Sequence, residues 1–129
     1  IALNTWKSAF LDNRRGYVSW HQDGIFCARL GLAEEAMEVA FKKLGDSPRR
    51  FPAFWGPGHD YVPDHNWGGS GMIGLQEMLF QEDLNSEIML LPAWPSDYDV
   101  KFKLHATSNR VVELEFNNGK TTFSKVYSE

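Results

Sequence analysis

The stretch from His59 to Gly71 brings together residue types that bind and hydrolyse sugars. It holds two carboxylates, two imidazoles, aromatic rings and adjacent glycines, in the order His59, Asp60, Tyr61, Asp64, His65, Asn66, Trp67, Gly68 and Gly69. Aromatic faces stack on sugar rings, polar side chains bind the hydroxyl groups, and glycine allows close backbone approach. The alternative interpretation is a surface loop in which Asp and Asn side chains cap turns and a helix start.

Asp64 is the strongest candidate for a catalytic group. Glycoside hydrolysis usually uses two carboxyl groups, one as acid and one as base or nucleophile. Asp64 stands just before a predicted helix and is flanked by Asn66, so it could hold a water molecule and accept its proton. Asp60 is the weaker candidate for this base, because Tyr61 and Pro63 indicate a turn. Helix capping is the structural alternative for Asp64.

The neighbouring side chains are the predicted substrate ligands. They comprise aromatic, imidazole, carboxylate and amide groups, namely Trp55, His59, Asp60, His65, Asn66 and Trp67. The His and Asp residues of this loop match no recurrent zinc spacing, so we predict no metal site. We also predict no cofactor, because Gly68-Gly69 lacks the preceding strand and following lysine of a phosphate-binding loop.

Composition narrows the class of partner. A net charge of −4 over 129 residues argues against nucleic acid, which favours a basic face. No apolar run approaches the ~20 residues that span a bilayer, so no membrane partner is expected. The single Cys27 leaves no internal disulfide and is expected to be a buried small residue. Lys42-Lys43 is interpreted as part of a solvated helix end.

The pattern of apolar residues changes near residue 84, which predicts helices in residues 1–83 and a β domain in 84–129. A first helix is predicted over Tyr17–Leu30 and ends at Gly31. A second is predicted over Ala33–Leu44, with a stripe of Ala33, Ala36, Met37, Ala40 and Leu44 and with Glu34, Glu35, Lys42 and Lys43 off it. After a long loop over 46–67, Ser70 is expected to cap a third helix that runs to about Gln81.

Residues after Glu87 alternate in the manner of strands. Four are predicted, over Ile88–Leu91, Val100–Leu104, Val111–Phe116 and Thr121–Val126. Asn118-Gly119 indicates a tight hairpin, because both residues tolerate the positive φ of a type I′ turn. Val112, Leu114 and Phe116 alternate with glutamates and predict one buried face. Four short strands need a partner layer.

These residues resemble the C-terminal part of glycoside hydrolase family 95, the inverting α-L-fucosidases and their relatives, or a closely related bacterial family. The first matching block is residues 64–71, Asp-His-Asn-Trp-Gly-Gly-Ser-Gly. The second is 77–81, Glu-Met-Leu-Phe-Gln, and the third is 87–93, Glu-Ile-Met-Leu-Leu-Pro-Ala. Upstream, 28–31 with 35–36 matches an Ala-Arg-Leu-Gly helix hairpin. The four blocks keep the order of the family and together touch most of residues 19–120.

The resemblance implies a fold and an activity. It implies the last helices of an (α/α) six-hairpin barrel followed by a small antiparallel β domain. It also places a water-activating role on Asp64, with an oligosaccharide or polysaccharide as substrate and the general-acid glutamate in an earlier part of the barrel. A periplasmic or secreted bacterial location is implied as well. Because the sequence begins at Ile1 without Met, we expect a piece of a longer protein, inactive alone, whose partner is the preceding part of the same chain.

Three departures leave the sugar and its linkage open. The first two blocks lie two residues further apart than the resemblance implies, and His65 replaces a glycine of the first block. Residues 102–108 read Phe-Lys-Leu-His-Ala-Thr-Ser where the family has a glycine-rich segment. Two other functions remain. One is a non-catalytic carbohydrate-binding module that uses Trp55, Tyr61 and Trp67 as a platform. The other is a structural domain that mediates assembly.

Overall fold

The predicted α+β class is confirmed. A computed structural model describes residues 1–11, 16–17, 21–45 and 65–128 of the chain. These residues form four helices followed by antiparallel strands, in the order α1 (Ala2–Leu11), α2 (Asp23–Arg29), α3 (Ala33–Leu44), α4 (His65–Leu79), β1 (Phe80–Glu82), β2 (Ile88–Leu90), β3 (Val100–Ala106), β4 (Arg110–Asn117) and β5 (Lys120–Ser128). No helix among them is long and apolar enough to cross a membrane.

The predicted helix hairpin is formed by α2 and α3. Helix α3 has the predicted bounds, Ala33–Leu44, and the extended backbone of Gly45 ends it at φ −71° and ψ 162°. Gly31 lies between the two helices at φ +71°, a conformation that glycine adopts without steric penalty. A local signal in the sequence therefore determines this turn.

The first predicted helix is shorter than its apolar pattern indicated. The structure shows α2 beginning at Asp23, whereas the prediction of a helix from Tyr17 is wrong. The Asp23 carboxylate accepts a hydrogen bond from the Gly16 backbone N–H, so the chain folds back onto the start of the helix. A Cβ atom on Gly16 would lie 2.9 Å from Nδ1 of His21, so Gly16 lies directly against the His21 ring. The preceding helix α1 was not predicted.

Helix α4 differs from its prediction at both ends. It begins at His65, five residues before the predicted cap Ser70, and it ends at Leu79 rather than near Gln81. The Ser70 hydroxyl instead donates to the backbone carbonyl of Asn66 at 2.6 Å and to that of Trp67 at 3.2 Å. Three glycines among the first seven residues have low helix propensity, so the early start depends on packing against α2 and α3.

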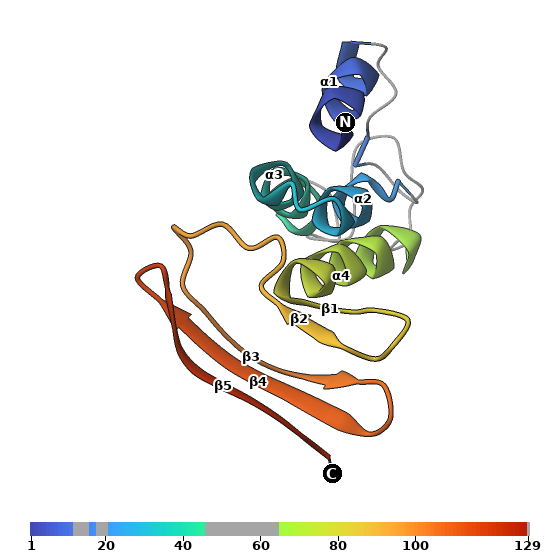
Figure 1. The fold of residues 1–129 in the computed structure, drawn as a ribbon. Coiled ribbons are helices and arrows are strands. Elements are labelled where there is room, and N and C mark those ends of the chain that lie inside the picture. Colours follow the sequence, from blue (N-terminus) through green and yellow to red (C-terminus); the bar gives the residue numbers. More distant parts are fainter. Residues whose placement is uncertain (12–15, 18–20, 46–64, 129) are drawn as a thin grey trace.

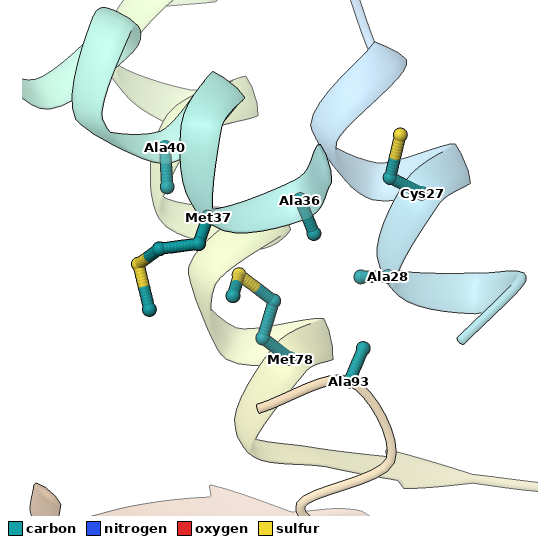
Figure 2. Close-up of a cluster of buried hydrophobic side chains, with 7 residues drawn as sticks. All are labelled: Cys27, Ala28, Ala36, Met37, Ala40, Met78 and Ala93. Carbon is teal, nitrogen blue, oxygen red and sulfur yellow. The ribbon is translucent and has the colours of Figure 1, made fainter. Parts of the chain in front are cut away.

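The helical core is built from small residues and methionines. Figure 2 shows it as a cluster contributed by α2, α3, α4 and the segment after β2, consisting of Cys27, Ala28, Ala36, Met37, Ala40, Met78 and Ala93. Trp6 and Trp94 pack against this cluster, as expected for core tryptophans, and Cys27 is fully buried as predicted. Alanine side chains allow the helices to approach, and methionine fills the irregular space between them.

The strands form two antiparallel sheets. β1 pairs with β2, which places Phe80 opposite Leu90, and the larger sheet has the order β3-β4-β5. Figure 1 shows the β1–β2 hairpin between α4 and the larger sheet. The four predicted strands correspond to β2–β5, whereas β1 was not predicted. The predicted change of character near residue 84 falls in the turn that joins β1 to β2.

The turn between β4 and β5 confirms the predicted hairpin. Asn118 and Gly119 have φ values of +50° and +73°, the positive values that a type I′ turn requires. They connect Asn117 and Lys120, which lie opposite each other. Glu115 pairs with Phe123 and Phe116 with Thr121, so Thr122 is an extra residue in β5 and forms a bulge.

The inner face of β4 agrees with the predicted alternation at two of three positions. Val112 and Leu114 are buried, but Phe116, next to the bulge, is half-buried. Val111, on the opposite face, is fully buried as well. The bulge therefore changes exposure near Phe116, while the centre of the sheet is covered on its inner side.

We predict that Leu114→Ala destabilises the protein by about 2–5 kcal/mol, because this side chain is 1% exposed in the central strand. The matched control is Phe123→Ala on the edge strand, which should change stability by less than about 1 kcal/mol since this ring is 44% exposed. Urea unfolding gives both free energies. Equal losses in the two variants would contradict the packing described for β4.

Candidate functional site

The candidate site residues divide between the start of α4 and the segment before it. Asn66 and Trp67 lie in the first turn of α4, and His65 is its first residue. Trp55, His59, Asp60 and Asp64 lie outside the described residues, as does Tyr61. In the sequence, Asp64 directly precedes the helix. The role of these residues in catalysis or sugar binding stays a prediction.

Trp67 is a packing residue of the interface between α3 and α4. Its side chain is 2% exposed, and its indole Nε1 donates to the backbone carbonyl of Lys43 at 2.5 Å. The Tyr17 ring meets it edge-on, with 6.0 Å between ring centroids. An edge-on pair and a buried indole hydrogen bond are typical of a structural tryptophan. The ring therefore does not form an open stacking platform in this structure.

Lys43 corrects the prediction of a solvated lysine pair at the end of α3. Lys42 is exposed and pairs with Glu38 one turn away, whereas Lys43 is 2% exposed. Position 43 lies seven residues after Ala36 and three after Ala40, so it belongs to the apolar stripe by spacing. Spacing alone could have identified Lys43 as an inward-facing lysine.

The glycines of α4 lie where other helices come closest. A Cβ atom on Gly71 would be 2.9 Å from Cδ2 of Leu44, and one on Gly74 would be 3.5 Å from the backbone of Gly24 and Ile25. A Cβ atom on Gly69, by contrast, would meet nothing within 4 Å. Part of the glycine-rich sequence that indicated close approach to a ligand is thus used for helix packing.

Two further sequence blocks meet where α2 crosses α4. Arg29 forms an ion pair with Glu77, in which Nη2 donates to Oε1 at 2.7 Å and Nε lies 2.7 Å from Oε2. Gln81 donates to the backbone carbonyls of Ala28 and Glu77, both at 3.0 Å. A hydrogen bond between charged groups is stronger than one between neutral groups. Arg29, Glu77 and Gln81 were not among the predicted site residues.

The third block closes the same core from the β side. Ala93 is buried in the cluster around Met78. The Leu91 N–H donates to the carbonyl of Leu79 at 2.7 Å, and Leu91 adopts φ +52° to do so. Three of the four matched blocks, 28–31, 77–81 and 87–93, therefore contact one another through side chains and backbone, although up to 65 residues of sequence separate their ends.

A polar cluster joins β1 to the turn between β3 and β4. Glu82 accepts hydrogen bonds from the Thr107 hydroxyl at 2.6 Å and from its backbone N–H at 2.9 Å. Glu82 also pairs with Arg110, which in turn donates to the Ser86 carbonyl at 2.9 Å. The bonds from Thr107, with the adjacent guanidinium, hold the pKa of Glu82 below its ordinary value of 4.5.

The outer face of the larger sheet carries paired charges. Lys101 pairs with Glu115, and Lys103 lies 3.2 Å from Glu113 across the strands. The Tyr127 hydroxyl donates to Glu113 at 2.6 Å. This hydrogen bond, followed by the one from Lys103, lowers the pKa of the Glu113 carboxyl. Because the charges neutralise one another at the surface, this face has the character of a solvated sheet.

Within the described part of the chain, no three His, Cys, Asp or Glu side chains gather in a way that could hold a metal ion. A comparison of the sequence with protein families and with curated proteins gives no match, and a comparison with solved structures gives none either.

We predict that Glu82→Gln lowers stability by about 1–3 kcal/mol at neutral pH, because the hydrogen bonds of Glu82 lose their charge assistance. A carboxyl with a depressed pKa stabilises the fold above its unfolded value of 4.5 and loses this contribution as the pH falls through its folded value. Thermal unfolding between pH 3 and 7 should therefore show the two proteins converging in acid. A stability difference between Glu82→Gln and the wild type that stays constant over this pH range would contradict the assignment. The control is Glu87→Gln, at an exposed glutamate of the same hairpin.

Proposed function

We propose that the chain is the C-terminal segment of a six-hairpin glycoside hydrolase related to family 95, acting on an oligosaccharide or polysaccharide. In this proposal α2, α3 and α4 belong to the last hairpins of the barrel, and the strands form its C-terminal β domain. Asp64 activates the attacking water in an inverting reaction, and the general acid is supplied by an earlier part of the barrel.

One observation carries the proposal, which is the meeting of three of the four matched blocks in a single packed unit. Arg29 of the Ala-Arg-Leu-Gly block binds Glu77 of the second block, and Gln81 binds the carbonyl of Ala28. Ala93 of the third block lies in the core with Met78. These contacts, together with the order of the four blocks in the sequence, support the proposed relationship.

The proposal assigns substrate contacts to the side chains around the start of α4. Asn66 is exposed in the first turn of this helix, where a side-chain amide can bind sugar hydroxyl groups. His65, His59, Asp60 and Trp55 are proposed as further ligands. Trp67, bonded to the Lys43 carbonyl, anchors the helix turn that carries Asn66.

Exposed apolar side chains on the helices support a segment that packs against more protein. Phe26 on α2 and Leu30 directly after it are each at least half exposed, as are Phe41 on α3 and Met72 and Ile73 on α4. A contiguous exposed apolar patch often marks an interface. We propose that preceding hairpins of the same barrel cover them.

The burial of Trp67 favours this proposal over the alternative of an open aromatic platform made of Trp55, Tyr61 and Trp67. A binding module needs its rings exposed and coplanar, whereas the Trp67 ring is enclosed between α3 and α4. A purely structural assembly domain remains the second candidate, because the exposed apolar side chains of α2 suit it equally.

We predict that Asp64→Asn lowers turnover of the full-length protein by about a hundredfold or more, with little change in substrate binding. A carboxylate that takes a proton in the transition state contributes about 10²–10⁴-fold, and the amide keeps its shape without its basicity. Hydrolysis of α-L-fucosides, followed by other neutral and deoxy sugar glycosides, supplies the assay.

Asp97→Asn is the matched control, because it makes the same change at an exposed aspartate outside the candidate site. It should leave turnover within a few-fold of the wild type. Asn caps a helix as well as Asp does. A capping role would therefore leave the Asp64→Asn variant fully active, and that result would remove the catalytic assignment.

A further inference from the structure

The side chain of Lys43 is buried, at 2% exposed. Lysine is rarely buried to this extent, because removing an ammonium group from water is unfavourable unless its surroundings compensate. The residue lies in the last turn of α3, where the helix dipole favours a positive charge. Its exposed neighbour Lys42 shares that advantage while remaining in water.

Both ends of Lys43 engage the same indole of α4. Its Nζ lies over the Trp67 ring, 5.1 Å from the centroid, and its backbone carbonyl accepts the hydrogen bond from Trp67 Nε1. An ammonium over an aromatic face is attracted by the ring quadrupole, and the attraction grows when water is excluded. These two contacts restrict both the position and the rotation of the ring.

The ring belongs to the first turn of α4. Trp67 is one residue from Asn66 and two from His65, and Asp64 directly precedes the helix in sequence. Gly71 lies one turn further on, and a Cβ atom placed there would lie 3.5 Å from Cβ of Lys43. Holding Trp67 therefore holds the backbone that carries Asn66 and that fixes where the helix begins.

We propose that Lys43 is a positioning residue for the site at the start of α4, acting through Trp67. This inference rests on the proposed function. An apolar side chain of similar length would fill the same space without burying a charge, so packing alone does not select lysine here. The ammonium adds a directional attraction to the ring face, which keeps the first turn in one orientation.

The test measures backbone exchange and kinetics in the full-length protein. Lys43→Met preserves the length of the side chain and removes its charge. We expect amide hydrogen exchange in residues 65–71 to become at least about tenfold faster, since local opening of the first turn becomes easier. We also expect kcat to fall about tenfold or more with KM changed less than about twofold, the pattern of a misplaced catalytic group.

Two variants serve as controls. Lys42→Met makes the same change at the adjacent, exposed lysine and should alter neither exchange nor kcat. Lys43→Arg keeps the positive charge and the cation–π attraction, and should restore kcat to within about threefold of the wild type. If Lys43→Met fails to fold, amide exchange over 65–71 and kcat are compared between Lys43→Arg and the wild type. A loss of kcat with unchanged exchange in Lys43→Arg overturns the proposal.

Two results would refute the positioning role. Unchanged exchange over 65–71 in Lys43→Met would show that the lysine does not hold the first turn. Faster exchange with unchanged kcat would show a structural contact without influence on the site. Failure of the proposed function gives a different result. The Asp64→Asn variant then keeps full turnover, independently of the results for the Lys43 variants.

Discussion

The close approach of α2, α3 and α4 is the constraint on which the other contacts of the helical unit depend. It requires positions without side chains, since a Cβ atom on Gly24 would lie 3.1 Å from Cγ1 of Val39 and one on Gly71 would lie 2.9 Å from Leu44. The ion pair of Arg29 with Glu77 also joins α2 to α4. Larger residues at these glycines would separate the helices and move both the core around Met78 and the first turn of α4.

The β1–β2 hairpin connects the helical unit of α2, α3 and α4 with the larger sheet. The backbone of Leu91 binds that of Leu79, and the side chain of Glu82 binds the turn at Thr107. Both attachments pass through the β1–β2 hairpin, which lies between α4 and the larger sheet (Figure 1). The hairpin therefore transmits the position of α4 to the sheet, and the polar bonds of Glu82 determine where the end of β3 lies.

The sequence predicted those features that local chemistry determines. Ala33–Leu44 has a regular apolar stripe and a terminal glycine, and Asn118-Gly119 has the one turn type that suits it, so both appear as predicted. The start of α4 could not be predicted in this way, because its glycines oppose helix formation and only the packing of Trp67 offsets them. Strand β1 was not predicted for a similar reason. Its three residues are too few to show an alternating apolar pattern, and its pairing partner begins eight residues later in the sequence.

The candidate site was predicted less completely than the fold. Trp67 was expected to face a sugar and is instead enclosed by Lys43 and Tyr17, contacts that no spacing rule connects with the loop. Asn66 is exposed at the helix start as a ligand would need to be. The chemistry assigned to Asp64 depends on the resemblance and on residues outside the described part of the chain. A composition rich in Asp, His and Trp therefore indicates a site more readily than it assigns each side chain its role.

The bulge at Thr122 has a consequence for how copies of this protein meet in a crowded solution. β5 forms the outer edge of the three-stranded sheet, and a flat edge strand of this length is a template on which another chain can add a strand. The extra residue interrupts that template, and the Thr122 hydroxyl holds the interruption in place by donating to the Glu115 carbonyl at 3.2 Å. Lys120 and Lys125 place like charges along the same edge, so two molecules that approach through β5 meet mutual repulsion and mismatched backbones. A small irregularity in one strand thereby opposes strand addition at this edge of the sheet.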